Sequence, residues 1–489
     1  MKRGNGETGA KRTAVISTAI LSEFVDLDLG DARREERLRK IVEAFAASPT
    51  SSFPELMRTA AELEAFYRFV NSDYVTFADL TAPHARATAR RIAESTGPVV
   101  VAHDPTEFTF SYDEDLRDGC EKMSGKTQGF YGNVSLAICA GSTEPLGVLH
   151  AETWTKGELT FKNPGQKAAP KHKGHGCGRV DGCRWEKFIE QSECPVADAS
   201  RLIHVIDREA DGFALYAKLI AAPRRFVIRV CRDRLVGVEG ASEEFVELSG
   251  AAETAKAVHT IDVPLSRRSR SKATKQHPAR KTRTAKLTYA AMKITLRRGG
   301  DVDKSLPKTI TLNVVCVREK NPPENEEPIE WLLATTEPIS TPDEVIAVVG
   351  YYRLRWRIEE FFRALKTGCA FERRQLESKP ALLNALAISL VVAWHVMVLR
   401  HASRARPGEP ASIALPPLAL FVLRATGRVP LRKNATVKEA LYAVAALGGH
   451  IKNNGDPGLT TLSRGMEHLL ERVVACVLMF QAIGGLAAK

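Results

Sequence analysis

The chain has 489 residues, of which 44% are hydrophobic and 26% charged, the composition of a soluble globular protein with room for several domains. Its formal net charge of +12 favours polyanion partners, nucleic acid first, although a basic enzyme of another kind is the alternative. The nine scattered cysteines are typical of reduced thiols and argue against a disulfide framework, so we expect a cytoplasmic protein.

The N-terminal part predicts a flexible leader, residues 1–20, followed by a helical domain, residues 21–96. The leader carries basic residues but lacks the layout of a signal peptide. The helical domain contains a basic cluster that could bind phosphates: Arg33, Arg34, Arg37, Arg39 and Lys40. Glutamates lie among these residues, so an ordinary solvated helix face is the alternative.

Residues 97–376 predict an α/β domain with a mixed sheet, because strands and helices follow one another along the chain. The apolar run 98–104 predicts a buried strand with Asp104 at its tip. The segment 201–212 predicts another strand, which ends on Asp207 and leads directly into a helix. Further strands are expected at residues 129–140, 145–154, 224–231 and 329–338.

Residues 232–330 break this pattern and predict a β-rich insertion. Within it, residues 266–286 are rich in Lys and Arg and almost free of apolar side chains, which predicts a mobile basic loop. Arg280 and Lys281 in this loop are candidate DNA contacts.

The C-terminal part, residues 377–489, predicts a helical domain. Its apolar segment 381–399 is nearly long enough to span a membrane. The segment contains Asn384, Ser389 and His395 and follows a charged helix directly, so a buried core helix is predicted and no membrane partner is expected.

Residues 351–368 mix basic, acidic and aromatic side chains in what is predicted to be one helix. At about 100° per residue, Tyr352, Arg355 and Lys366 fall within about 40° of Glu359, beside an apolar face that would pack on a core. One carboxylate flanked by phosphate-binding side chains suits phosphodiester chemistry. An amphipathic helix with internal ion pairs, such as Arg355–Glu359, is the alternative.

Two strand-end aspartates suggest where that carboxylate acts. If the strands that end on Asp104 and Asp207 are neighbours in one sheet, both carboxylates emerge at the same edge, and a helix can bring Glu359 to them. Three carboxylates form the oxygen-ligand site that Mg²⁺ or Mn²⁺ prefers. The alternative for each aspartate is to cap a helix N-terminus.

The spacing Tyr352-x2-Arg355-x3-Glu359-x6-Lys366 resembles the YREK signature of the DDE transposases of the insertion-sequence-four family, of the cut-and-paste type. Other segments resemble the family's landmarks in the same order: "LGDARREERL" and "AFYRFVN" its end-binding region, "HDPTEFTFS" and "VIDREADG" its two Asp segments, "RFVIR" a DNA-contacting strand, "EWLLATTEP" its tryptophan segment, and "ALYAVAALGGH" its dimerisation region.

The resemblance implies an RNase H-like fold with a β insertion before the catalytic Glu. It also implies that Asp104, Asp207 and Glu359 bind two Mg²⁺ ions, for which Mn²⁺ can substitute. Activated water would nick the transposon end, and the freed 3′-OH would form a hairpin that is reopened and joined to target DNA. The working state would be a synaptic homodimer on double-stranded DNA, associated with the nucleoid.

DNA contacts are implied as well. Tyr352, Arg355 and Lys366 would hold phosphates near the cut, and Trp331 would stack on a flipped base, with a core residue on a strand as the alternative. The remaining implied DNA contacts are Arg229 in the catalytic domain and Arg33, Arg34, Arg37 and Arg68 in the N-terminal domain.

Some features depart from the family pattern. Pro105 and Glu107 follow Asp104 where a Thr-rich turn is expected.

A zinc site is conceivable at one cluster, although its spacing fits no standard site: His172, His175, Cys177 and Cys183. Two other functions also stay open, a non-catalytic DNA-binding relative that inhibits a transposase and a stand-alone metal-dependent nuclease.

Overall fold

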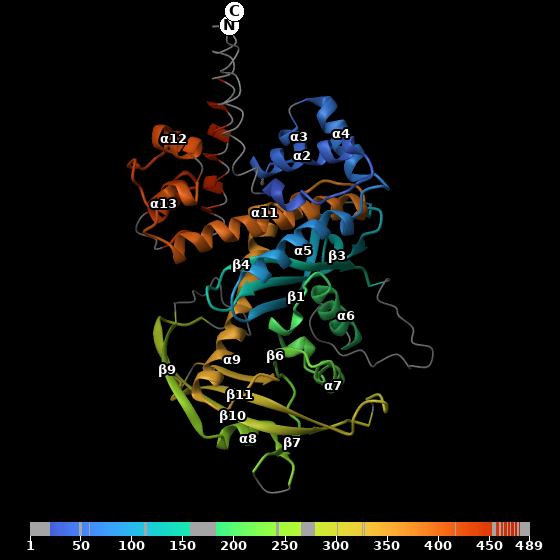
Figure 1. Cartoon of the computed structure of the whole chain (residues 1–489), viewed down its shortest axis with the longest axis vertical. Helices are drawn as coiled ribbons and strands as arrows, with labels where there is room; N and C mark the ends of the chain where they lie inside the picture. Colours follow the sequence, from blue (N-terminus) through green and yellow to red (C-terminus); the bar gives the residue numbers. More distant parts are fainter. Residues whose placement is uncertain are drawn as a thin grey trace, which may run out of the picture. The chain divides into compact units, whose positions relative to one another are not determined.

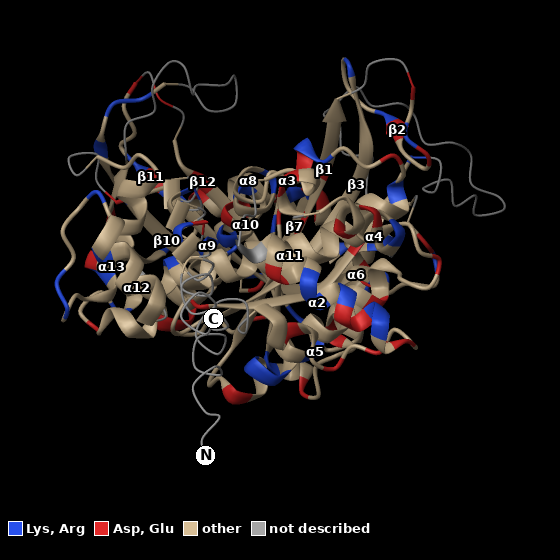
Figure 2. Ribbon diagram, turned by 90° about the horizontal axis from the view of Figure 1, so that it is seen from above, with Lys and Arg blue, Asp and Glu red and all other residues tan. Residues whose placement is uncertain are grey.

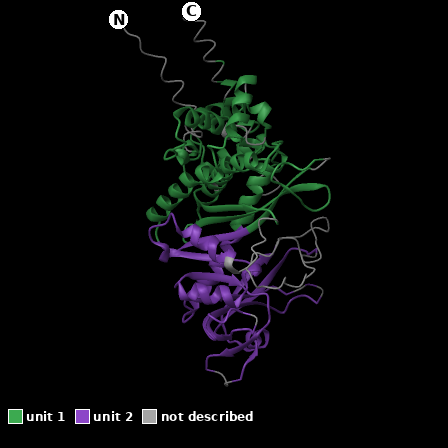
Figure 3. Ribbon diagram, turned by 90° about the vertical axis from the view of Figure 1, so that its right-hand side faces the viewer, with its two compact units in different colours: residues 1–96, 105–177, 357–489 green, residues 97–104, 178–356 purple. Residues whose placement is uncertain are grey.

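The computed structural model consists of two compact units (Figure 3). Unit 1 comprises residues 1–96, 105–177 and 357–489, and unit 2 comprises residues 97–104 and 178–356. The structure describes residues 20–479 except 48–50, 58, 112–114, 157–181, 241–243, 266–278, 301, 325, 327, 416, 452–455, 459–460, 463, 467, 470, 474 and 477–478.

The long strand β1 (Val99–Ser111) contributes to both units. Its first part is buried continuously, as in a strand covered on both faces, and pairs in parallel with β5 (Leu202–Ile206) in unit 2. Its second part, in unit 1, alternates between buried and half-exposed side chains and buries Phe108 and Phe110. The prediction that the strand ends at Asp104 is therefore wrong, because these two phenylalanines continue the strand into the core of unit 1.

Unit 2 is built on a sheet in which β5 pairs in parallel with β6 (Arg225–Arg229), and all later pairs are antiparallel. Beyond β6 the order is β12-β11-β10-β7-β8, with β9 also on β10. Their bounds are β7 Leu235–Val238, β8 Val246–Glu247, β9 Ala257–Leu265, β10 Arg283–Arg297, β11 Thr309–Lys320 and β12 Glu330–Thr335. The predicted insertion is thus made mainly of strands.

The helices of unit 2 are α6 (Gly182–Glu193), α7 (Phe213–Ala221), α8 (Leu248–Thr254) and α9 (Pro342–Leu354), with the short turns η2 (Ala199–Arg201) and η3 (Arg208–Ala210). Helix α9 begins at a capping box, in which Thr341 and Glu344 bond each other's backbone N–H groups and Pro342 occupies the first turn. The helix packs against β5, β6, β10 and β11, which places its last turn beside the ends of the parallel strands.

Unit 1 contains the antiparallel strands β2 (Glu121–Lys122), β3 (Thr127–Cys139) and β4 (Pro145–Trp154), in the order β2-β3 with β4 also on β3. Strand β3 neighbours β1. Gly129 allows the two strands to approach there, because a Cβ atom on it would lie 1.8 Å from the Phe108 carbonyl oxygen.

The sheet order confirms the predicted fold class. Along β4-β3-β1-β5-β6, β4 is antiparallel to β3, β3 neighbours β1, and β5 and β6 run parallel to β1, which is the order of an RNase H-like sheet. The β-rich insertion follows before α9, as the resemblance implies.

The helices of unit 1 form two groups, one before and one after the strands. The first comprises η1 (Ser22–Phe24), α2 (Ala32–Ala47), α3 (Phe53–Leu56), α4 (Ala60–Val70) and α5 (Phe77–Glu94). The second comprises α10 (Trp356–Arg363), η5 (Ala364–Gly368), η6 (Phe371–Arg373), α11 (Lys379–Ala405), η7 (Ala411–Ile413), α12 (Pro417–Thr426) and α13 (Val437–Leu447). Helices α5 and α11 lie side by side and both pack on β4 (Figure 1).

Helix α11 contains the apolar segment that the sequence analysis assigned to the core. Residues Lys379–Ala402 are long and apolar enough to cross a membrane by length and composition, and their most apolar window has a mean hydropathy of 2.2. Of their most apolar window, 72% is buried inside the structure, as in a core helix of a soluble protein. Asn384 donates to the carbonyl oxygens of Val70 (3.0 Å) and Val75 (2.9 Å), which ties α11 to the N-terminal helices.

A buried polar cluster fixes the N-terminal segment to α5. The carboxylate of Glu23 lies 2.6 Å from Nδ1 of His84 and 2.7 Å from Nη1 of Arg91. Nε2 of His84 accepts the backbone N–H of Val148 at 3.0 Å, so the neutral ring must donate from Nδ1 to Glu23. Burial lowers the pKa of His84, against the opposing effect of Glu23.

We expect the stability of unit 1 to fall as the pH decreases from about 6.5 to about 4. Burial lowers the pKa of His395 on α11 to about 4, so the folded state resists protonation that the unfolded chain accepts. The free energy of unfolding therefore begins to decrease as the pH falls below the pKa of His395 in the unfolded chain. The decrease levels off below its pKa in the folded state, at roughly 1–3 kcal/mol.

Thermal unfolding measured across this pH range tests the expectation. His395→Gln should flatten the dependence, whereas the partly exposed His468→Gln should leave it unchanged. A melting temperature that does not change between pH 7 and pH 4 would contradict the argument.

Candidate active site

Asp104 and Asp207 lie at the same level of two adjacent parallel strands. The register pairs Val99 with Leu202 and Ala102 with Val205, and the same offset continued two residues further would bring Asp104 opposite Asp207, which directly follows β5. Because side chains alternate between the faces of a sheet, this offset favours the same face for both carboxylates. The condition set in the sequence analysis, that the strands leading to the two aspartates are neighbours in one sheet, is met.

Neither aspartate caps a helix with its side chain. Asp104 lies within β1, and Asp207 precedes the short turn η3 without a side-chain hydrogen bond to it. Parallel pairing with β5 ends at Ala102, and Pro105 has no backbone N–H to extend it. The strand therefore opens at the position where Asp104 stands, and its side chain is 20% exposed.

Arg355 bridges the two aspartates. Its Nη1 lies 3.1 Å from Oδ1 of Asp104, and its Nη2 lies 3.6 Å from Oδ2 of Asp207. Only 9% of the arginine is exposed, so the contact is largely shielded from solvent. The guanidinium balances one of the two negative charges, and this cluster of three side chains carries a net charge of −1.

Tyr352 completes the cluster from the last turn of α9. Its hydroxyl donates to Oδ1 of Asp207 at 3.1 Å. Burial, followed by the negative charge of Asp207, raises the pKa of the phenol to about 12, so it stays a donor at neutral pH.

Trp331 and Arg229 lie next to this tyrosine. The ring of the half-buried Trp331 makes an edge contact with the Tyr352 ring, at 5.2 Å between centroids. Arg229, whose charge also acts on Tyr352, donates to the carbonyl oxygen of Glu330 at 3.4 Å. An aromatic ring and a guanidinium therefore lie together beside the two carboxylates.

The predicted single helix over residues 351–368 is wrong. Helix α9 ends at Leu354, Arg355 bonds back to the Tyr352 carbonyl oxygen at 3.1 Å, and α10 begins at Trp356. The last stretch, Ala364–Gly368, is a π-turn, a form that is frequent at functional sites. The turn tightens at Arg355, whose side chain is held by two carboxylates, and widens at Lys366. Both changes shift the helical phase, so the four residues of the YREK spacing do not share one face as an even helix would predict.

Glu359 and Lys366 belong to unit 1, whereas the aspartates belong to unit 2. Glu359 is half-buried on α10. Within unit 1, Nζ of Lys366 donates to the Glu107 carbonyl oxygen on β1 and lies 3.3 Å from Glu372. That Glu359 joins Asp104 and Asp207 stays a prediction.

The donors of the site fit a divalent cation. Two carboxylates on adjacent strands, with one net negative charge after pairing with Arg355, offer the hard oxygen ligands that Mg²⁺ and Mn²⁺ prefer. Among the described residues no group of three or more His, Cys, Asp or Glu side chains is placed to hold a metal ion. Within the described residues, Asp104 and Asp207 are the two carboxylates that Arg355 holds together at this site.

The N-terminal arginines lie on helices whose charges are mixed. Arg33 is 92% exposed at its side chain and pairs with Asp31 at 3.1 Å, and blue and red residues follow one another along α2 (Figure 2). Arg34 donates to the Leu29 carbonyl oxygen at 2.8 Å, and Arg37 is half-exposed. Arg68 on α4 is exposed, 3.9 Å from Glu64.

The basic insertion loop is only partly within the described residues. Residues 266–278 lie outside them, Arg280 is half-exposed and Lys281 exposed. The predicted loop is wrong from Arg283 onward, because β10 begins there. The guanidinium of Arg283 bonds Glu319 and lies 2.7 Å from Glu326, which anchors the strand end.

The candidate zinc cluster lies outside the described residues. His172, His175 and Cys177 fall in the range 157–181, and the side chain of Cys183 is also not described.

A feature that the sequence analysis missed lies behind the aspartates. Nε2 of His103 and Nδ1 of His204 are 2.9 Å apart and fully buried, and Nε2 of His204 is 3.1 Å from Glu193 on α6. His103 directly precedes Asp104, so its side chain points to the opposite face of the sheet. Histidines inside two apolar strand segments were the signal for this network.

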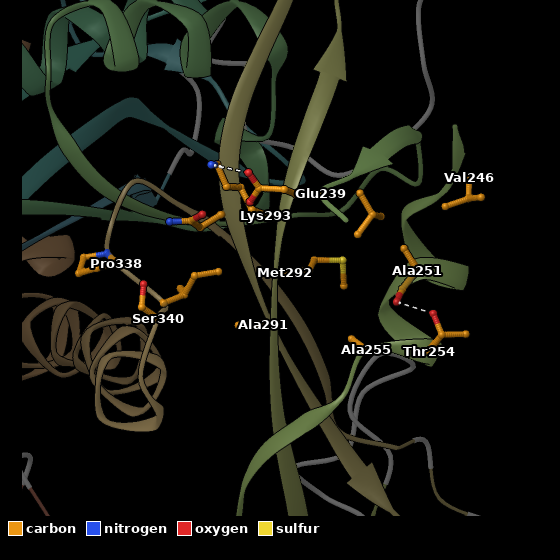
Figure 4. Close-up of a pocket in the computed structure, with 13 residues that line it drawn as sticks. Glu239, Val246, Ala251, Thr254, Ala255, Ala291, Met292, Lys293, Pro338 and Ser340 are labelled. Atoms are coloured by element: carbon orange, nitrogen blue, oxygen red, sulfur yellow. Dashed lines mark hydrogen bonds and ion pairs between the residues drawn. The ribbon is translucent and has the colours of Figure 1, made fainter. Parts of the chain in front are cut away.

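A cavity lies elsewhere in unit 2. It has a volume of about 830 Å³ and is enclosed by strands β7 and β10, helix α8 and the segment before α9 (Figure 4). The ion pair between Lys293 and Glu239, at 2.9 Å, lies on its wall. None of the predicted site residues lines it.

Two family models match the chain. Residues 198–394 match the model described as the transposase DDE domain. The chain carries a DDE transposase domain. Residues 16–75 match the model described as transposase DNA-binding, so this domain is preceded by a DNA-binding one, and DNA as the partner is supported.

The matched ranges cover most predicted site residues. The DDE domain includes Asp207, Glu359 and the whole YREK spacing, and the DNA-binding domain includes Arg33, Arg34, Arg37 and Arg68. Asp104 lies before the matched DDE range. The assignment to the insertion-sequence-four family stays a prediction.

Among solved structures, the chain is similar to a piggyBac transposase synaptic complex with hairpin DNA, determined by cryo-EM. The identity is 11%, the match covers 82% of this chain and 74% of that chain, and the TM-score is 0.35.

Proposed function

We propose that the protein is a cut-and-paste DNA transposase of the insertion-sequence-four family. It would cut the ends of its mobile element and join them to target DNA. The observation that carries this proposal is the pair Asp104 and Asp207, which the paired parallel strands β1 and β5 bring together under Arg355, with Asp207 inside the range that matches the transposase DDE domain.

Asp104 and Asp207, with Glu359, would hold two Mg²⁺ ions, and Mn²⁺ could substitute. Bound there, the ions would supply the Lewis acidity that activates the attacking oxygen and stabilises the leaving one. Arg355 would keep the two aspartates in place until then, because its guanidinium bridges them.

The residues around the carboxylates would position DNA. Arg355 and Lys366 carry the positive charge that phosphates need, and the hydroxyl of Tyr352 can donate to a phosphate oxygen. The exposed part of Trp331 would stack on a base turned out of the duplex, which stabilises by about 1–3 kcal/mol. Arg229, next to Tyr352, would contact the backbone of the same strand.

The proposed reaction begins with a nick at each end of the element. The freed 3′-OH attacks the opposite strand and forms a hairpin, which is reopened and joined to target DNA. In this proposal the N-terminal DNA-binding domain holds the element end, and residues 377–489 form the dimer interface that pairs the two ends in one synaptic complex.

The test is excision from a supercoiled plasmid that carries the DNA flanking this gene on both sides. With purified protein we expect Mg²⁺- or Mn²⁺-dependent release of the element, with hairpin ends as an intermediate, and no release in the presence of a chelator. Binding of this DNA without any cutting would favour the non-catalytic relative. Cutting at sites unrelated to the element ends would favour the nuclease.

A further inference from the structure

A second, smaller cavity lies in unit 1, where the C-terminal end of α11 meets α13 (Figure 1). Its volume is about 240 Å³. Its charged and hydrogen-bonding side chains come from three segments of the chain: Arg400 and Arg404 of α11, Lys438 and Tyr442 of α13, and Asp456.

Positive charge exceeds negative charge in this cavity. Three cations face a single carboxylate. The hydrogen bond from the Tyr442 hydroxyl lowers the pKa of Asp456 most, and the positive charges of Arg404, Lys438 and Arg400 lower it further. Arg400 also reaches out of the cavity to Glu360 on α10, at 2.9 Å. Among the described residues, Arg404 and Lys438 form no ion pair within 4 Å, although both charges act on Asp456.

The hydroxyl of Tyr442 donates to Oδ1 of Asp456 at 2.5 Å, and Lys438 lies 5.8 Å from the Tyr442 ring. The carboxylate of Asp456 thus lies among the cations, where a bound anion would also lie. The helices that carry Arg404 and Lys438 are tied together at the cavity rim, because the backbone N–H of Lys438 bonds the Pro407 carbonyl oxygen at 3.2 Å.

We propose that this cavity binds a phosphate of the DNA backbone, so that the C-terminal helical region contacts DNA as well as serving the dimer. Guanidinium groups match phosphate oxygens with two parallel donors, and an ammonium group and a phenol hydroxyl supply further donors at the same rim. The inference rests on the proposed function, which makes DNA the available polyanion in a chain with a net charge of +12.

Binding of a duplex, measured over about 50–200 mM salt with the full-length protein, tests the proposal. The duplex carries one end of the flanking DNA. The double variant Arg404→Gln/Lys438→Gln should make the slope of log affinity against log salt shallower by about one, and weaken binding by about tenfold near 100 mM salt. Asp456→Asn should strengthen binding by about threefold, because it removes a carboxylate that repels the phosphate.

The control is Arg428→Gln/Lys433→Gln, which removes the same charges from exposed positions of the same region outside the cavity and should leave the slope unchanged. Equal slopes in the two double variants would overturn the proposal, while excision in the plasmid assay would still support the transposase. Thermal stabilisation by inorganic phosphate that is lost in the cavity variant, without a change in the DNA slope, would also overturn it and assign the cavity to a free anion. A wild-type protein that binds no DNA would remove both proposals.

Discussion

Asp207→Asn is expected to reduce metal-dependent cleavage of DNA by about a thousandfold or more, while affinity for the element end stays within about threefold. A carboxylate that holds the catalytic cation contributes several kcal/mol to transition-state stabilisation, and each 1.36 kcal/mol is a factor of ten. Asparagine keeps the oxygen that accepts the Tyr352 hydroxyl, so the local fold should persist. Cleavage of labelled duplex and binding are measured in parallel.

The matched control is Asp198→Asn. Asp198 is an exposed aspartate of unit 2 that lies outside the site and whose side chain, among the described residues, accepts hydrogen bonds from Ser200. This variant should cleave as the wild type does. If Asp207→Asn retains more than about a tenth of the activity, Asp207 does not hold the cation and the site has been assigned to the wrong residue.

Asp211→Asn is expected to destabilise unit 2 by about 3 kcal/mol or more, although it lies only four residues from Asp207. The side chain of Asp211 is fully buried and pairs with Arg234 at 2.6 Å. It also accepts the backbone N–H groups of Cys231 (2.8 Å) and Arg232 (2.9 Å) and the hydroxyl of Tyr216 (2.8 Å). Asparagine removes the charge and turns an NH₂ group toward one of these donors, which leaves buried polar groups unsatisfied.

Thermal unfolding measures this effect, and a decrease of roughly 6–12 °C is expected. The exposed Asp198→Asn should change the melting temperature by less than about 2 °C. An unchanged melting temperature for Asp211→Asn would show that the four contacts of Asp211 do not determine the stability of the unit.

The sequence was sufficient to predict that each aspartate follows a buried strand segment, although β1 continues past Asp104. Each aspartate follows a short run of apolar residues, which is typical of a buried strand. Two such strands in an α/β domain are expected to run parallel. Their equal register could not be predicted, because it depends on how β1 and β5 align through contacts far apart in the sequence. The RNase H-like fold with a β insertion before the catalytic Glu followed from the family resemblance and agrees with the observed order of the strands.

The helix that carries the YREK spacing was harder to predict. Helical periodicity assumes an even turn, whereas the turn tightens at Arg355 and widens at Lys366. The tightening coincides with the contacts of the Arg355 side chain to Asp104 and Asp207, which are 251 and 148 positions away in the chain. A local pattern carries no information about such partners.

Other contacts have no local signal either. Arg404 and Lys438 come from separate helices and are 34 positions apart, so no motif marks the cavity that they share. The buried histidine pair behind the aspartates also depends on the register of two strands.

The most direct test of the central claim is excision from the plasmid by Glu359→Gln, compared with Glu377→Gln. Glu377 is exposed in unit 1 and outside the site, so its variant should excise the element as the wild type does. We predict that Glu359→Gln binds the element ends but releases no element with Mg²⁺ or Mn²⁺. Excision by Glu359→Gln at the wild-type rate would contradict the carboxylate triad and, with it, the proposed mechanism.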